Sequence, residues 1–398
     1  MTLVELMVAV TIGLGITLAI TSVMIASENH KRVTTSTNDA QQTGTFSYYA
    51  LDKVIRGAGS AIAESALPSD VGVLGCHLNA TTTVAGTIFP RPAAFPQPFA
   101  GFLGGAAGNL NVAPLLIGQN QSQGGSDVLM VMGGSGSAGG VSRQITGGGN
   151  ATTATLDNSV GFAAGDLVLV SQSGTPDCLL EQVDTIAPPA SPTLNFGGGA
   201  AYYTAAAVTT TMATLAGSTS SYVTPLGNAP ANNIQFLLFG VDNNNTLVSY
   251  DLLRNLQIVG LSGGDAVQSI ADGVVSLNAL YGLDTDGDGK QDTWAAPGAP
   301  TDATWDINTV MNSQAKIKQI VSVRVALVVR GEYYDKNNNN AVSQPTLTIF
   351  NGLKNGLNGT GVSLARNINL TALDQQFRYR VFEFTVPLRN MLIVAGAP

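Results

Sequence analysis

The sequence predicts an α+β protein in which one long N-terminal α-helix packs on a mainly antiparallel β-sheet head with long loops. Three observations predict this class. Residues 2–55 have helical spacing and no proline, several later segments have strand patterns, and most of these strands follow one another through hairpins rather than helical crossovers. The helix would account for residues 1–60 and the β-rich head for residues 61–398.

The first part of the helix, residues 1–27, is apolar enough to cross a membrane. No residue between Leu6 and Ala26 is charged, and a spanning helix needs about 20 apolar residues. Glu5 is the exception. Because an ionisable group at the edge of such a segment is costly unless it is paired, we expect Glu5 to have a partner.

Two simpler interpretations of this segment leave observations unexplained. A signal peptide starts with basic residues and has a shorter apolar run, but nothing basic precedes this run. An ordinary anchor does not explain Glu5, and Lys31 and Arg32 would oppose the positive-inside rule. A basic leader removed from in front of Met1 would resolve both difficulties. The helix would then cross the membrane with Met1 on the inner side and the rest of the chain on the outer side.

The second part of the helix, residues 28–60, is amphipathic. Apolar and small residues recur every three or four positions from Val33 to Ile55. This pattern predicts that one face packs on the head and that the helix stops near Gly57.

Strand patterns begin near residue 127 and become clearest towards the C-terminus. Short apolar or alternating runs predict strands at the following places: 127–132, 166–170, 234–240, 246–252, 274–281, 318–330 and 377–386. Residues 61–125 and 187–231 are rich in Pro, Gly, Ala and Thr instead. We expect these two regions of the head to be rich in loops.

Composition excludes some classes of function. Only 11% of the residues are charged and the net charge is −8, whereas nucleic-acid binding requires a basic face. We therefore expect no nucleic-acid partner. Cys76 and Cys178 are the two cysteines. In an exported head one disulfide is favoured over two free thiols.

One acidic stretch has the spacing of a calcium-binding loop. Its candidate ligands are the carboxylates of Asp284, Asp286, Asp288 and Asp292 and the backbone carbonyl of Lys290. The four aspartates occupy positions one, three, five and nine of such a loop, and Lys290 occupies position seven. The twelfth position, where an EF-hand has a bidentate glutamate, is an alanine. We expect a solitary structural Ca²⁺ loop between strands. A solvated acidic turn is the alternative, although four close carboxylates repel one another without a cation.

The chain offers little for catalysis. Its two histidines, His30 and His77, lie in the predicted helix and beside Cys76, and there is no Gly-x-Ser-x-Gly elbow. We therefore expect no enzyme activity, with an enzyme domain carried on a helical anchor as the alternative.

Residues 2–10, Thr-Leu-Val-Glu-Leu-Met-Val-Ala-Val, resemble the mature N-terminus of a type IV pilin or pseudopilin. In that family a prepilin peptidase cuts after a glycine and methylates the new N-terminal residue. The resemblance implies a methylated amine at Met1 and an assembly role for Glu5, although Met is less usual than Phe at the first position. An ammonium at one subunit's Met1 would neutralise a neighbour's Glu5 inside an apolar bundle, where unpaired charge is costly.

Three later segments, residues 165–170, 281–289 and 378–390, resemble a PilW-type minor pilin. The resemblance implies a pilin fold and a subunit that helps to prime or cap a type IV pilus. It also implies a single-pass inner-membrane protein that later joins an extracellular pilus, with a periplasmic or extracellular head. The expected partners are other pilins, the inner membrane and prepilin peptidase. The alternatives are an adhesin that binds a surface ligand through loops between residues 80 and 231, or a dominant shaft-forming pilin with a large head.

Overall fold

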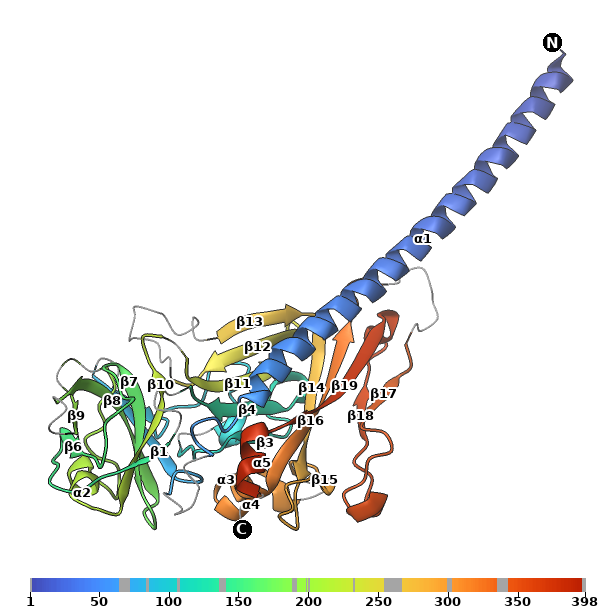
Figure 1. Cartoon of the computed structure of the whole chain (residues 1–398). Coiled ribbons are helices and arrows are strands. Elements are labelled where there is room, and N and C mark those ends of the chain that lie inside the picture. The colour runs from blue at the N-terminus through green and yellow to red at the C-terminus, as the bar shows by residue number, and fades with distance from the viewer. Residues whose placement is uncertain are drawn as a thin grey trace.

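The computed structural model describes residues 2–63, 72–83, 86–105, 108–135, 141–187, 192–197, 199, 201–231, 233–253, 267–298, 303–334 and 343–395. One long helix projects from a wide, β-rich body (Figure 1). The expected α+β class, with a long N-terminal helix and mainly antiparallel sheets, is confirmed.

Helix α1 (Leu3–Arg56) has Thr2 as its N-cap and Gly57 as its C-cap. Its buried residues are spaced by three or four and all lie in the second half: Ser36, Ala40, Gly44, Ser47, Leu51 and Ile55. The most apolar part of the helix is not buried at all. The second half of α1 therefore packs on the head through one face, as its amphipathic pattern predicts, whereas the first half is exposed.

The buried face of α1 packs on a four-stranded antiparallel sheet. Its strands, in spatial order, are β15 (Thr293–Ala295), β14 (Val274–Leu283), β16 (Ile320–Arg330) and β19 (Tyr379–Pro387). The rings of Tyr48 in α1 and Phe384 in β19 meet edge-on, with centroids 4.6 Å apart. The predicted strands at 274–281, 318–330 and 377–386 are confirmed.

Three short helices lie at the end of this sheet farthest from the N-terminus: α3 (Ile307–Met311), α4 (Gln314–Gln319) and α5 (Arg389–Ala395) (Figure 1). Asn390 at the start of α5 donates a hydrogen bond of 2.9 Å from Nδ2 to the backbone carbonyl of Ala58. The C-terminal end of the chain is thereby tied to the end of α1.

A second, five-stranded antiparallel sheet extends the core. Its strands, in spatial order, are β13 (Val267–Asp272), β12 (Thr246–Asp251), β11 (Gln235–Val241), β4 (Val128–Gly133) and β3 (Leu115–Gly118). Buried side chains of this sheet, of the four-stranded sheet and of α1 belong to one continuous cluster. This cluster fixes the second half of the helix to the head.

The third sheet forms a lobe on the far side of the body from β17 and β18 (Figure 1). Its eight strands are β1 (His77–Thr82), β2 (Gly86–Phe89), β5 (Arg143–Gln144), β6 (Thr153–Thr155), β7 (Asp166–Gln172), β8 (Asp177–Ile186), β9 (Thr193–Phe196) and β10 (Ser221–Asn228). Helix α2 (Met212–Ala216) covers part of it and contributes to a separate apolar core. Among the strand pairs that the structure describes, β1 and β8 are the parallel pair.

Residues 61–125 and 187–231, which we expect to be rich in loops, also contain strands that the sequence analysis did not identify. Strands β1, β2 and β3 lie in the first region, and β9, α2 and β10 lie in the second. Strand β10 carries Pro225, where its pairing with β7 shifts register, a position at which a strand tolerates proline. Strands β2, β3 and β9 are short, so residue preference alone gives them little signal.

A separate hairpin of β17 (Thr346–Ile349) and β18 (Arg366–Asn369) lies beside the four-stranded sheet (Figure 1). It has its own small core, which includes Ile349, Phe350 and Leu364. The backbone N–H of Phe350 donates a 2.7 Å hydrogen bond to Oε1 of Glu383 in β19, which joins the hairpin to the sheet.

Candidate functional site

The first half of α1 exposes a continuous series of large apolar side chains. They are Leu3, Val4, Leu6, Met7, Val8, Val10, Ile12, Leu14, Ile16, Leu18, Ile20, Val23, Met24 and Ile25. The mean hydropathy of the most apolar window is 2.3, and the helix is long enough to cross a membrane. Because soluble proteins rarely expose a patch of this size, this surface requires an apolar environment such as lipid or other helices.

Glu5 lies at the tip of this exposed half-helix. Its carboxylate accepts a hydrogen bond of 3.1 Å from the backbone N–H of Thr2, and the Thr2 hydroxyl accepts one of 3.4 Å from the backbone N–H of Glu5. This reciprocal capping box holds the carboxylate at the N-terminal end of the helix. Met1, the residue for which we expect processing and methylation, lies outside the described residues.

The acidic stretch forms a tight loop between β14 and β15, with no helix on either side. One carboxylate oxygen from each of Asp284, Asp286 and Asp292 lies within 4.8 Å of the other two. Among the described residues, these three form the group of His, Cys, Asp or Glu side chains whose ligand atoms lie close enough together to hold one metal ion. Strands, rather than the helices of an EF-hand, position this loop, in line with the sequence analysis.

Asp284 is the anchor of the loop because its side chain is buried and holds two glycine amides. Its Oδ1 accepts from Gly287 N at 2.7 Å, and its Oδ2 accepts from Gly289 N at 2.8 Å. Both glycines have φ near +80°, a conformation that most other residues avoid. The glycines of the motif are therefore needed for the turn that folds the chain back over Asp284.

The structure separates Asp288 from the other carboxylates. Asp288 accepts a 2.6 Å hydrogen bond from Nζ of Lys290, which lowers the pKa of Asp288 and raises that of Lys290. Asp292 accepts hydrogen bonds from the hydroxyl and the N–H of Thr285, which lower its pKa. These hydrogen bonds favour the ionised forms of Asp288 and Asp292. Three of the four predicted carboxylates, those of Asp284, Asp286 and Asp292, converge.

This donor set fits a hard divalent cation. Carboxylate and backbone oxygens are the ligands that Ca²⁺ takes, six to eight at a time. Asp286 is exposed and Asp292 is half-buried, so a cation could enter from solvent. The ammonium of Lys290 would compete with a cation for these carboxylates. Asp286 and Asp292, in addition to Asp288, raise the pKa of Lys290 and so favour its charged form.

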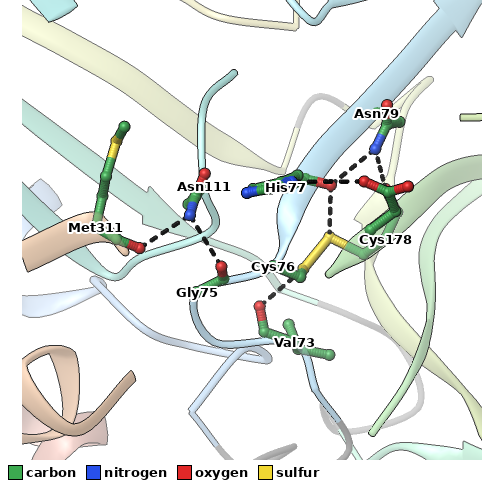
Figure 2. The surroundings of a disulfide bond; sticks show 9 residues. Val73, Gly75, Cys76, His77, Asn79, Asn111, Cys178 and Met311 are labelled. Carbon is green, nitrogen blue, oxygen red and sulfur yellow. Dashed lines mark hydrogen bonds and ion pairs between the residues drawn. A yellow bond between two sulfur atoms is a disulfide. The ribbon is translucent and has the colours of Figure 1, made fainter. Parts of the chain in front are cut away.

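Cys76 and Cys178 form a disulfide with Cα atoms 5.7 Å apart and a sequence separation of 102 residues. Figure 2 shows the surrounding contacts, in which Nδ2 of Asn79 donates to the carbonyl of His77. Nδ2 of Asn111 donates at 3.0 Å to the carbonyl of Met311 in α3 (Figure 2). The disulfide links the residue before β1 to β8 within the eight-stranded lobe. Asn111, which also donates to the carbonyl of Gly75, connects the chain beside this lobe to α3.

Two buried carboxylates were not identified from the sequence. Asp127 is fully buried and accepts hydrogen bonds from Nη1 of Arg366 at 2.7 Å and from the N–H of Ala279 at 2.9 Å. Glu181 in β8 is also buried, and its carboxylate accepts from the N–H of Thr204. Burial raises the pKa of Glu181 to about 8, against the lowering effect of that hydrogen bond. Neither carboxylate lies in a recognisable motif, since their partners are distant in sequence.

Residues 235–390 match the family model of Type IV Pilus-assembly protein W. The matched span contains the four-stranded sheet, the acidic loop and the β17–β18 hairpin. No curated protein and no solved structure matches the chain. The match confirms the resemblance at residues 281–289 and 378–390, whereas residues 2–10, residues 165–170 and every strand of the eight-stranded lobe lie outside the matched span. The C-terminal part of the chain is therefore similar to PilW-type proteins of type IV pilus assembly.

Proposed function

We propose that this PilW-type, pilus-related chain is a type IV pilin subunit that assembles through its N-terminal helix and helps to prime or cap the filament. One observation carries the proposal: a single helix has one half fixed in the head and the other half entirely exposed and apolar. Such a half-helix can first span the inner membrane and then exchange lipid for neighbouring helices. The head would be periplasmic and then extracellular, where disulfides persist.

Glu5 supplies the specificity of assembly in this proposal. Within the described residues of one subunit, its carboxylate accepts a hydrogen bond from the backbone N–H of Thr2, which is a neutral donor. An ammonium at Met1 of a neighbouring subunit, created when prepilin peptidase removes a leader, would compensate the negative charge of Glu5. Pairing inside an apolar bundle favours correct register, because a misplaced charge would stay unpaired.

The size of the head favours a low-copy position at the end of the filament. Three sheets and the β17–β18 hairpin are carried by one helix. Helices in a bundle pack about 8–10 Å apart, so a head this wide would crowd adjacent heads along a shaft. The main alternative is a shaft-forming pilin whose sparsely charged, small-residue surface tiles against copies of itself.

The second alternative, a filament-displayed adhesin, is favoured by one observation. The eight-stranded lobe has an apolar cluster of its own, and all of its strands lie outside the span that matches pilus assembly. A lobe of this kind could carry a surface-binding function without altering assembly. Deleting the chain separates these roles: loss of pili supports priming, whereas normal pili with reduced attachment supports adhesion.

We also propose that the loop of Asp284, Asp286 and Asp292 binds a structural Ca²⁺, with the carbonyl of Lys290 as a further ligand. The convergence of three carboxylate oxygens within 4.8 Å supports this proposal. Ca²⁺ would relieve the repulsion between these carboxylates and secure the connection between β14 and β15. Asp288 would join the ion only by leaving Lys290.

A further inference from the structure

A cluster of aromatic, aliphatic and basic side chains lies where the head meets the exposed half of α1. We call it the rim, and it consists of Arg32, Tyr333, Tyr334, Leu373, Phe377 and Arg378. Tyr333 and Tyr334 follow β16, whereas Leu373, Phe377 and Arg378 precede β19. The backbone N–H of Gly331 donates to the carbonyl of Arg378, which holds the two segments together.

The geometry of α1 places the rim close to any bilayer that the helix spans. The uncharged segment from Leu6 to Ala26 is about 30 Å long, which equals the hydrocarbon thickness of a bilayer. Arg32 lies about 9 Å beyond Ala26 along the helix, and its guanidinium lies 5.7 Å from the centroid of the Tyr333 ring. Helix α1 also leaves the body on the side of β17 and β18 (Figure 1). The head therefore begins at the depth of the lipid headgroups.

The rings of the rim pack on one another and on cations. The Tyr334 and Phe377 rings have centroids 5.2 Å apart, and the guanidinium of Arg330 lies 4.2 Å from the Phe377 centroid. Aromatic side chains with polar neighbours are enriched at membrane–water interfaces, because their rings suit the headgroup level.

Leu373 is the most exposed apolar part of the rim, with 70% of its surface accessible. It lies in a turn closed by reciprocal hydrogen bonds, in which Thr371 N donates to Asp374 Oδ2 and Asp374 N donates to Thr371 Oγ1. The turn is held by these bonds, so the leucine is presented to the outside instead of folding onto the head.

The charges of the rim differ from those of the rest of the chain. Around the rim lie five basic residues, namely Lys31, Arg32, Arg330, Arg378 and Arg380. The acidic residues beside it are Glu28, Asp39, Glu332 and Asp374. Glu28 pairs with Arg32 at 3.2 Å, and Asp374 is bonded within its turn. The local balance is 5 − 4 = +1, whereas the whole chain is 18 − 26 = −8, which leaves −9 for the remainder. Among the described residues around the rim, basic side chains thus outnumber acidic ones, whereas the chain as a whole is acidic.

We propose that, before assembly, the rim docks the head on the surface of the bilayer that α1 spans, with Leu373 among the lipid headgroups. Arg378 then contacts lipid phosphates, and Tyr333, Tyr334 and Phe377 lie at the interface. Docking would hold the head in one orientation beside the membrane until the helix is extracted into a filament. This inference rests on the proposed membrane insertion of α1.

The test uses the full chain in lipid nanodiscs of phosphatidylethanolamine and phosphatidylglycerol. Single variants Leu373→Cys, Leu357→Cys and Ile16→Cys carry an environment-sensitive fluorophore, and both native cysteines are occupied by their disulfide. Leu357 is the matched control, because it is another exposed leucine, 55% accessible, in the loop that joins β17 to β18. Brominated lipids quench a fluorophore only at the depth of the bromine.

Docking predicts that lipids brominated near the headgroup quench the label at position 373 several-fold more than the label at position 357. Amide exchange of residues 371–378 in the unmodified chain should slow in nanodiscs relative to detergent micelles. A deeply quenched label at position 16 together with a water-exposed label at position 373 overturns docking but leaves the spanning helix intact. A label at position 16 without quenching overturns both.

Discussion

Gly44 in α1 lies directly against the ring of Phe382 in β19, so that a Cβ at position 44 would overlap the ring carbon Cε2. No real side chain tolerates such a contact, so the helix or the ring must move if residue 44 gains a methyl group. Gly44 is therefore the point at which the helix approaches the sheet most tightly among the glycines of α1. The close packing of α1 on β19 therefore depends on the absence of a Cβ at position 44.

Gly44→Ala should destabilise the head. Alanine gains about 1 kcal/mol of helix propensity over glycine, but overpacking a filled site costs about 1–3 kcal/mol. We expect a net loss, seen as a lower melting temperature of the full chain in detergent. Gly13→Ala is the control, because no atom lies within 4 Å of the place that its Cβ would take, and it should be neutral or slightly stabilising. Equal effects of the two substitutions would contradict the packing argument.

Removing the disulfide should destabilise the eight-stranded lobe. The chain-entropy relation gives about 4–5 kcal/mol for a loop of roughly a hundred residues. The double variant Cys76→Ser/Cys178→Ser should unfold at lower denaturant concentration than the unmodified chain. Peptide mapping without reductant should recover the two cysteines in one linked pair. Two alkylatable thiols in the native protein would contradict this pairing.

Stability should depend on pH through Glu181. Its folded-state pKa is about 8, above the ordinary value of 4.5, so the folded state binds more protons than the unfolded state between these values. Stability is therefore complete below about pH 4.5 with respect to this group and falls as pH rises towards 8, by up to about 1.4 kcal/mol per pH unit. Glu181→Gln should remove this slope and raise stability at pH 8. An unchanged slope in the variant would assign the dependence to another group.

Calcium should raise the melting temperature of the chain, and chelation should expose the β14–β15 loop to protease. Asp284→Asn and Asp292→Asn should abolish the shift, and Mg²⁺ should substitute poorly because it requires a tighter octahedral site. Asp288→Asn should have a smaller effect, since the structure pairs Asp288 with Lys290. Asp242→Asn, in another Asp-containing turn, is the control. Identical melting curves with calcium and with chelator would exclude the site.

The sequence predicted features that depend on periodicity and missed those that depend on distant partners. Helix α1 and strands β14, β16 and β19 were predictable, because their residues show the spacing of a helix or the apolar and alternating runs of strands. The ion pair of Asp127 with Arg366 joins residues 239 positions apart in the sequence, and no local sequence pattern predicts it. In the acidic loop, spacing identified the carboxylates, but only the turn geometry shows that Asp288 bonds Lys290 while Asp284, Asp286 and Asp292 converge.

Glu5→Val should leave membrane insertion intact, because the apolar segment becomes more apolar. Incorporation into filaments should fall sharply, since a neighbour's N-terminal ammonium loses its partner in the bundle. Glu28→Val is the control, because Glu28 lies beyond the apolar segment and pairs with Arg32 at the surface. Equal amounts of unmodified and Glu5→Val protein in sheared filaments would contradict the charge pairing.

The most direct test of the central claim is quantitative mass spectrometry of sheared, purified pili. The account predicts that this chain is present at low copy beside a major pilin and begins with a methylated Met1 in its processed form. A chain that is absent from the filaments, or that retains an unprocessed N-terminus within them, would contradict its assignment as a pilin subunit.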